Sequence, residues 1–162
     1  MAIKIITTGG TIDKIYFDQK STFQVGEPQI VGLLKEANVT VDYEVKSVLR
    51  KDSLDMTDED RQLIYETILT DSHRKFIVTH GTDTMVVTAR RLQELTEKVV
   101  VLTGAMQPAK LKVSDAVFNI GFAIASVQLL PSGVYIAMNG CLFTPDRVQK
   151  NVEYNRFEVC NN

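Results

Sequence analysis

The chain contains 162 residues, which is enough for one compact domain but too few for two ordinary ones, so we expect a single domain over residues 1–162. Its net charge of −2 provides no broad basic field, which argues against nucleic acid or an anionic membrane as a partner and favours small-molecule chemistry. The two cysteines and two histidines lack metal-ligand spacing, so we predict no metal site and no cofactor, and place the histidines on the surface or in loops.

In chain order, runs rich in Val and Ile alternate with helical patterns of about 10–15 residues, which is typical of βα units around a mostly parallel sheet. The predicted strands cover residues 3–8, 43–49, 75–79, 99–103, 133–138 and 142–143. The predicted helices cover residues 30–36, 57–69, 83–95 and 115–130. We therefore predict an α/β fold with a doubly wound, mostly parallel sheet and helices on both faces.

Two of these helices have apolar residues at helical spacing, which predicts the face that each turns toward the core. The expected core positions are Leu63, Ile64, Ile68 and Leu69 in the helix that follows Thr57, and Val117, Ile120, Ile124 and Val127 in the helix over residues 115–130. The polar and aromatic segment over residues 13–27 is predicted to be a long loop. Loops of that length are often lids over a site, and a plain surface loop is the alternative.

Two short segments each follow an apolar strand and place threonine directly after glycine. They are Thr7-Thr8-Gly9-Gly10-Thr11 and Thr79-His80-Gly81-Thr82-Asp83. Either segment alone is compatible with a tight turn or a helix cap. Ligands of open α/β sheets bind outside the carboxyl ends of the strands, and both segments lie at such ends. We therefore expect two hydroxyls and a carboxylate in one pocket.

A threonine hydroxyl becomes a useful nucleophile when a neighbouring base accepts its proton and nearby donors stabilise the oxyanion. The Gly9-Gly10 backbone offers candidate donors beside Thr11. Thr82 precedes a helix whose first N–H groups favour a substrate carboxylate, and Asp83 can hold a substrate ammonium. The sequence lacks the glycine patterns of phosphate and dinucleotide sites and the Gly-x-Ser-x-Gly elbow of serine hydrolases. The pattern favours a pocket for an amino acid whose side chain is attacked.

Together, the two threonine motifs resemble the signatures of the bacterial-type L-asparaginase and glutaminase amidohydrolases. The resemblance continues in the family's order through Thr103-Gly104-Ala105-Met106-Gln107-Pro108, Ser114-Asp115 with Asn119, Met138-Asn139, Arg147-Val148 and Lys150. It spans nearly the whole chain and implies a homologue of the family's catalytic N-terminal domain. The family continues into a second domain after the lysine motif, whereas this sequence stops at Asn162, so we expect that domain to be absent.

The resemblance implies a catalytic role for four residues. Thr11 is the nucleophile that forms an acyl-enzyme with the side-chain carbonyl of the amino acid. Thr82, Asp83 and Lys150 form a second set, in which Lys150 lowers the proton affinity of Thr82 so that this hydroxyl relays a proton or orients water. From the residues alone, Lys150 is indistinguishable from an ordinary surface lysine.

The resemblance also implies substrate contacts: Ser53 with the α-carboxylate, Asp83 with the α-amino group and the Ala105 carbonyl with the leaving amide. The remaining predicted substrate-binding residues are Gly10, Gly81, Tyr16 and Phe23. Phe23 stands where the family usually carries a lid tyrosine, so Tyr16 is the candidate for that hydroxyl. Leu54 stands where glutamine is common, which removes a polar contact to the substrate carboxylate.

These observations predict an amidohydrolase that converts L-asparagine or a similar small amide to the acid and ammonia without a cofactor. The alternatives are a non-catalytic amino-acid binding module and an ammonia-delivering subunit for an amidation partner. The apolar N-terminal stretch is too short for a signal sequence, and no apolar segment approaches the roughly 20 residues of a membrane helix, which predicts a cytoplasmic protein. A monomer would leave the pocket short of one wall, so we expect a homodimer or higher homo-oligomer, unless Phe143, Tyr154 and Phe157 only complete the monomer's core.

Overall fold

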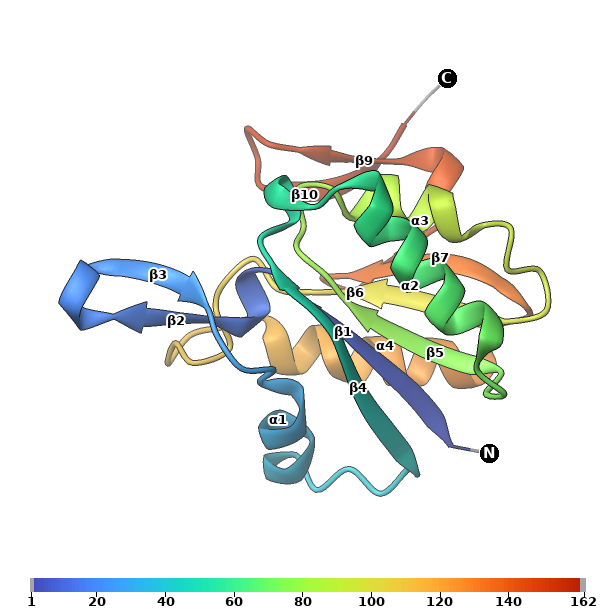
Figure 1. The fold of residues 1–162 in the computed structure, drawn as a ribbon, viewed down its shortest axis with the longest axis horizontal. Helices are drawn as coiled ribbons and strands as arrows, with labels where there is room; N and C mark the ends of the chain where they lie inside the picture. The colour runs from blue at the N-terminus through green and yellow to red at the C-terminus, as the bar shows by residue number, and fades with distance from the viewer. Residues whose placement is uncertain (1, 161–162) are drawn as a thin grey trace.

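The computed structural model describes residues 2–160 and is built around a six-stranded sheet (Figure 1). In spatial order the strands are β4 (Tyr43–Lys51), β1 (Ile3–Gly9), β5 (Lys75–Thr79), β6 (Val99–Thr103), β7 (Gly133–Met138) and β8 (Cys141–Phe143). Neighbours from β4 to β7 pair in parallel, and β8 returns antiparallel to β7 along one edge. The prediction of a mostly parallel sheet is confirmed.

Helices cover both faces of this sheet, which confirms the doubly wound arrangement. Helices α2 (Asp58–Thr70) and α3 (Met85–Leu92) lie over one face, and α1 (Ile30–Glu36) and α4 (Ala116–Leu129) lie over the other (Figure 1). Short 3₁₀ turns are η1 (Thr11–Asp13), η2 (Asp18–Lys20), η3 (Ser53–Asp55) and η4 (Pro145–Arg147). No helix within residues 2–160 is long and apolar enough to span a membrane.

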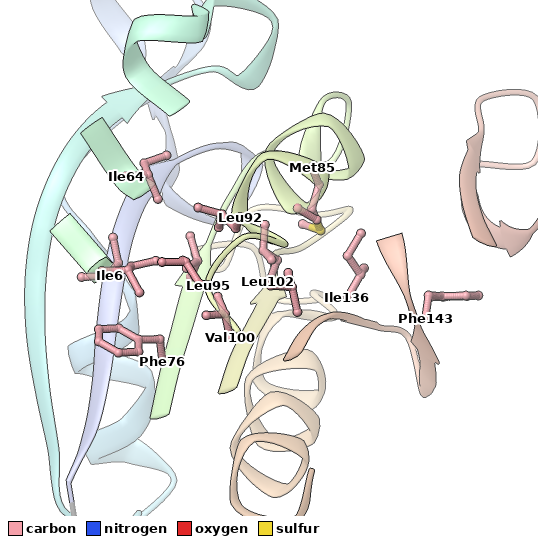
Figure 2. Close-up of a cluster of buried hydrophobic side chains, with 14 of the residues drawn as sticks. Ile6, Ile64, Phe76, Met85, Leu92, Leu95, Val100, Leu102, Ile136 and Phe143 are labelled. Carbon is pink, nitrogen blue, oxygen red and sulfur yellow. The ribbon is translucent and has the colours of Figure 1, made fainter. Parts of the chain in front are cut away.

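The parallel strands divide their side chains between two cores. Phe76 and Val78 of β5 enter the core beneath α2 and α3, whereas Ile77 between them enters the core beneath α1 and α4. Figure 2 shows Phe76 with other members of the first of these cores. Each fully buried side chain of this size contributes roughly 1.5–3 kcal/mol to folding. Helices therefore pack on both faces of the sheet, and the loops at its carboxyl edge start from fixed positions.

The predicted helical faces are partly wrong. Helix α2 begins at Thr57 with a capping box in which the Thr57 hydroxyl accepts from the Asp60 N–H. Ile64 and Ile68 are buried as expected, whereas the predicted core residues Leu63 and Leu69 of α2 and Val117 of α4 are each about half exposed. Neighbouring apolar residues widen the apolar stripe beyond the width that the sheet covers, so the flanking positions face outward.

Two hairpins appear where no strands were predicted. The expected loop over residues 13–27 forms β2 (Lys14–Phe17) and β3 (Thr22–Val25), an antiparallel pair that projects from the body of the domain (Figure 1). The second hairpin, β9 (Val148–Asn151) and β10 (Arg156–Val159), packs above the edge of α3.

The second hairpin also completes the core near the edge strand β8. Phe143 and Phe157 are buried there, with their ring centroids 6.5 Å apart. Tyr154 is exposed and does not join them, because it lies in the turn between β9 and β10. Of the three aromatic residues considered for the monomer's core, Phe143 and Phe157 therefore belong to it and Tyr154 does not.

Candidate functional site

The two threonine motifs meet because their strands are neighbours. Thr7 of β1 pairs with Thr79 of β5, so the loops that follow emerge side by side at the carboxyl edge of the sheet. A Cβ on Gly10, whose φ is +90°, would overlap the backbone of Gly81 in the neighbouring loop. Only glycine permits this approach of the two main chains, and it brings the segments that carry Thr11 and Thr82 into contact.

Lys150 completes one half of the site from a distant part of the sequence. Its ammonium Nζ donates to the Thr82 Oγ1 at 2.7 Å and to the Asp83 Oδ1 at 2.7 Å. The Thr82 residue is only 5% exposed, and Lys150 is mostly covered, whereas Asp83 is open to solvent. The Lys150 ammonium therefore lies within hydrogen-bond distance of both residues expected to act with it, and the Thr82 hydroxyl that it contacts is shielded from bulk water.

Strand β9 positions that lysine because it is paired with a strand anchored in the core. Lys150 stands directly opposite Phe157 of β10, and Phe157 is buried against Phe143. Val148, two residues before Lys150, is also buried. Lys150 thus lies in a strand whose position is fixed by the apolar contacts of Val148 and Phe157.

Thr11 begins the short turn η1 and is partly exposed, while the next residue, Ile12, is buried in the core beneath α4. The predicted oxyanion donors beside it are only partly available. The Gly10 N–H donates to the Lys51 carbonyl at 2.9 Å, so this group is already satisfied by the end of β4. The Gly10 N–H is therefore occupied in this conformation, and its position permits the close approach of the two loops, while its part in substrate binding stays a prediction.

Ser53 lies in the floor of the site rather than on its surface. Its residue is 1% exposed, and its hydroxyl accepts from the Thr84 N–H at 3.3 Å, while the Thr84 hydroxyl donates to the Ser53 carbonyl at 2.8 Å. A Cβ on Gly81 would come within 2.7 Å of the Ser53 side chain. Ser53 therefore ties η3 to the start of α3, and its hydroxyl proton has no acceptor among the hydrogen bonds of the described residues.

Ala105 is buried beside the same edge of the sheet, in a loop held by the Asp115 carboxylate. That carboxylate accepts from the backbone N–H groups of Met106 and Gln107 and from the amide of Asn139, at 2.8–3.0 Å. Although burial raises the pKa of Asp115, these hydrogen bonds outweigh it and hold the pKa below its usual value. The loop that presents the Ala105 carbonyl is therefore fixed by an ionised carboxylate.

Tyr16 and Phe23 face each other across the β2–β3 hairpin. They are a directly opposed cross-strand pair, with ring centroids 5.4 Å apart in an edge-to-face arrangement, so both side chains lie on the same side of the hairpin. Phe23 lines an open cavity of about 580 Å³ between the hairpin and the end of β4, bordered by Lys51 and Asp52. A tyrosine at position 23 would therefore place its hydroxyl on the same side of the hairpin as the hydroxyl of Tyr16.

Sequence reasoning missed the support beneath the Thr82 loop. His80, predicted to be on the surface or in a loop, lies in the loop after β5 but is fully buried. Its Nδ1 lies 2.7 Å from the Gly81 carbonyl and its Nε2 lies 2.7 Å from the Thr88 hydroxyl, to which Arg61 donates at 3.2 Å. Burial lowers the pKa of His80 to about 4, helped by the Arg61 charge and opposed by the bond to Gly81. The ring is therefore neutral, with its proton on Nδ1.

A second buried titratable group lies at the base of the β2–β3 hairpin. The Asp13 carboxylate accepts from the Gln29 N–H at 2.9 Å, and the Asp13 carbonyl accepts from the Gly26 N–H at 2.8 Å. Burial raises the pKa of Asp13 to about 6, although the Gln29 bond and the Arg50 charge act in the opposite direction. Asp13 joins the two ends of the hairpin two residues after Thr11.

Fold and site together define a doubly wound α/β domain whose strand-end loops hold two threonines, one of them bonded to a lysine and a carboxylate. The chain belongs to the asparaginase N-terminal family, whose model matches residues 2–159. L-asparaginase 2 of Escherichia coli strain K12 is 32% identical over 149 residues, which cover 85% of this chain and 42% of that protein.

Solved structures agree with this membership. The thermostable L-asparaginase from Thermococcus kodakarensis superposes with a TM-score of 0.86 at 26% identity, covering 100% of this chain and 52% of that one. A probable cytoplasmic L-asparaginase from Campylobacter jejuni gives 0.83 at 29% identity, covering 98% and 52%. The chain spans about half the length of the curated relatives it matches.

Cellular location stays a prediction, because another relative, 35% identical over 149 residues (85% of this chain, 42% of that protein), is named as a probable periplasmic L-asparaginase of Haemophilus influenzae.

Proposed function

We propose that this chain hydrolyses the side-chain amide of L-asparagine, or of a similar small amino acid, to the acid and ammonia. The observation that carries the proposal is the hydrogen-bonded set of Thr82, Asp83 and Lys150 beside the loop of Thr11. A site that only bound an amino acid would have little use for an ammonium placed on a buried hydroxyl, because that arrangement stabilises negative charge on the oxygen.

In the proposed reaction, the Thr11 oxygen attacks the amide carbonyl carbon. The new C–O bond replaces the C–N bond, and the proton released by the Thr11 hydroxyl leaves on the departing ammonia. Thr82 relays that proton, because the positive charge of Lys150 at 2.7 Å lowers the cost of negative charge on the Thr82 Oγ1. Water then attacks the ester, the acid departs, and the Thr11 hydroxyl is restored.

The surrounding groups provide contacts for a zwitterionic substrate. The Asp83 carboxylate is open to solvent and can accept from an α-ammonium with the oxygen that Lys150 does not occupy. Ser53 can donate its hydroxyl proton to the α-carboxylate, and the Ala105 carbonyl can accept from the amide that leaves. Tyr16 and Phe23, which share one side of the hairpin, are expected to cover the substrate.

The test is ammonia release from a panel of amino-acid amides by the purified chain and by Thr11→Ala. We expect release from one or a few small amides and its loss, by about 10³-fold or more, in the variant. The matched control is Thr96→Ala at an exposed position in the loop before β6, which should leave the rate unchanged.

Each alternative function gives a distinct result. Binding of aspartate by calorimetry without ammonia from any amide would favour the binding module, and release only after a cell extract is added would favour an ammonia-delivering subunit. Undiminished turnover by Thr11→Ala would remove the nucleophile assignment.

A further inference from the structure

The turn η1, which carries Thr11, is held against the end of β4 on both of its sides. Before the turn, the Gly10 N–H donates to the Lys51 carbonyl at 2.9 Å. After the turn, the ammonium Nζ of Lys14 lies 2.9 Å from the Asp52 Oδ2, at the point where β2 leaves the body of the domain (Figure 1). Only η1 separates these two contacts along the chain, so Thr11 has little freedom to move relative to the end of β4.

Asp52 connects the second contact to the turn η3, which contains Ser53. The Asp52 Oδ1 accepts from the Leu54 N–H at 3.1 Å. The Asp52 carbonyl accepts from the Asp55 N–H at 3.0 Å and closes the same turn. One carboxylate therefore binds Lys14 with one oxygen and caps η3 with the other, so a single side chain joins η1 to η3.

The ion pair between Lys14 and Asp52 is partly sheltered from solvent. The two side chains are 26% and 30% exposed, and both line the open cavity between the hairpin and the end of β4. Partial burial raises the pKa of Asp52, but the hydrogen bonds that it accepts and the positive charges of Lys14 and Lys150 hold it below its usual value. The carboxylate is therefore ionised at neutral pH, and the contact joins two full charges.

The other strand of the hairpin has an ion pair that does not join the two turns. Glu27, which follows β3, pairs with Arg50 of β4. Neither residue borders η1 or η3, and both side chains are more exposed than those of Lys14 and Asp52. The chain thus contains a second ion pair of the same hairpin that differs from the first in its position relative to the site.

The turns η1 and η3 carry groups that would meet opposite ends of the substrate. Under the proposed function, on which this inference rests, Thr11 attacks the side-chain amide and Ser53 binds the α-carboxylate. The separation of these groups must match the number of methylene groups between the two ends of the substrate. A site with a fixed separation disfavours a side chain that is one methylene too long or too short, by roughly 10–200-fold.

We propose that the ion pair of Lys14 and Asp52 sets the separation between η1 and η3, and thereby the length of the amide side chain that the site accepts. Both are positioning residues, because they act through the two turns rather than on the reacting atoms. The backbone bond of Gly10 fixes one side of η1, and the ion pair fixes the other. Without the pair the separation varies more, and an amide of the less favoured length is accepted more readily.

The test is the ratio of kcat/KM for ammonia release from L-asparagine and L-glutamine, whose side chains differ by one methylene. Asp52→Asn keeps an oxygen for the Leu54 N–H but removes the charge. Lys14→Met keeps a side chain of similar length without the ammonium. We expect each variant to shift the ratio toward 1 by about 3–5-fold, the effect of losing a partly exposed ion pair. Thermal unfolding monitored by circular dichroism checks that the variants fold.

The ratio separates this role from a general effect on the site. The charge of Asp52 also acts on Lys150, so Asp52→Asn can change turnover of both amides, but a change common to both cancels in the ratio. The double variant Lys14→Met/Asp52→Asn should give the same ratio as either single variant, because one substitution already breaks the pair. Shifts that add in the double variant would contradict a shared role.

The matched control is Glu27→Gln, which breaks the ion pair on the other strand of the hairpin and should leave the ratio unchanged. A purely structural effect of loosening the hairpin would shift the ratio in this variant as well. Equal shifts in Glu27→Gln and Asp52→Asn would therefore overturn the inference, and so would no shift in either.

Binding provides a second measurement that does not need turnover. L-aspartate and L-glutamate are the acids that the two amides would yield, and they differ by the same methylene. In calorimetry, the ratio of their dissociation constants should also shift toward 1 in Asp52→Asn, by about 3–5-fold. If no amide releases ammonia but this ratio shifts, the proposed function fails and the spacing role stands. A wild-type chain that distinguishes the two lengths in neither measurement would overturn the spacing role.

Discussion

The loop that carries Thr82 rests on buried polar groups, whereas the loop that carries Thr11 leads directly into an exposed hairpin. Beneath Thr82, the neutral ring of His80 connects the Gly81 carbonyl to the Thr88 hydroxyl. Beyond Thr11, the side chains of residues 18–24 are all exposed, and the hairpin is joined to the body at its base by Asp13 and by the ion pair of Lys14 with Asp52. The Thr82 half of the site is therefore preformed, whereas the Thr11 half, with its hairpin, can open with the loss of few buried contacts.

The two halves also respond to acid in opposite directions. The pKa of Asp13 is raised to about 6, so its contribution to folding is fully present below about 4 and is lost as the pH rises through 6. The pKa of His80 is lowered to about 4, so its contribution is fully present above about 6.5 and is lost as the pH falls toward 4. Between pH 4 and 6 the two contributions offset each other, each amounting to about 3 kcal/mol at most.

The largest expected effect comes from removing the Lys150 ammonium beside the preformed Thr82 loop. Lys150→Met should lower kcat for ammonia release by about 10²–10³-fold, because the Thr82 Oγ1 loses its charged partner. The melting temperature should change little, since Asp83 stays open to water. The control Lys46→Met, at an exposed position of β4, should keep full activity, and equal losses in both variants would contradict the assignment.

The variant Asp13→Asn separates the effect of Asp13 on the pH dependence of stability from the effect of His80. The variant should be more stable than wild type at pH 7, by up to about 3 kcal/mol, because a buried carboxylate no longer has to ionise. At pH 4 the two proteins should be nearly equal, since Asp13 is then protonated in the folded state. Denaturant unfolding at both pH values measures the difference. Asp18→Asn, at an exposed position of the hairpin, is the control, and a stability gain that is the same at both pH values would be inconsistent with the titration.

The smallest expected effect concerns the hairpin hydroxyl. Tyr16→Phe should lower kcat/KM by about 10-fold if its hydroxyl hydrogen-bonds the bound substrate or the transition state. Because residues 16 and 23 share one side of the hairpin, Phe23→Tyr in the same chain should restore most of the loss. Tyr43→Phe on β4 is the control, and a double variant no better than Tyr16→Phe would refute the shared position.

The sheet and the meeting of the two threonine loops were predictable because they follow from local signals. Apolar β-branched runs indicated the buried strands, and glycines at their ends indicated the loops. The β2–β3 hairpin was not predicted, because most of its residues are exposed on both sides and therefore show no apolar alternation. Strand β9 was missed for the same reason, since only Val148 of its four residues is buried.

The support of the site depends on contacts between distant residues, which a single sequence does not reveal. Arg61 and Thr88 come from different helices and meet only after α2 and α3 pack on the same face of the sheet. Lys150 reaches Thr82 across 68 positions of the chain, and only the family resemblance distinguished it from other lysines. A signal for His80 existed in its place after the apolar run Phe76–Val78 of β5, which favours burial over a surface position.

Lys150 has a further consequence through its position on β9, opposite the buried ring of Phe157. During synthesis, both threonines and their strands leave the ribosome well before the residues that hold the lysine in register. The nascent protein can thus bury most of its interior while its amine still lacks an anchor. Under the proposed function, chemical competence should emerge only as residues 156–159 pair with β9, so ammonia release would report on the folding of this hairpin.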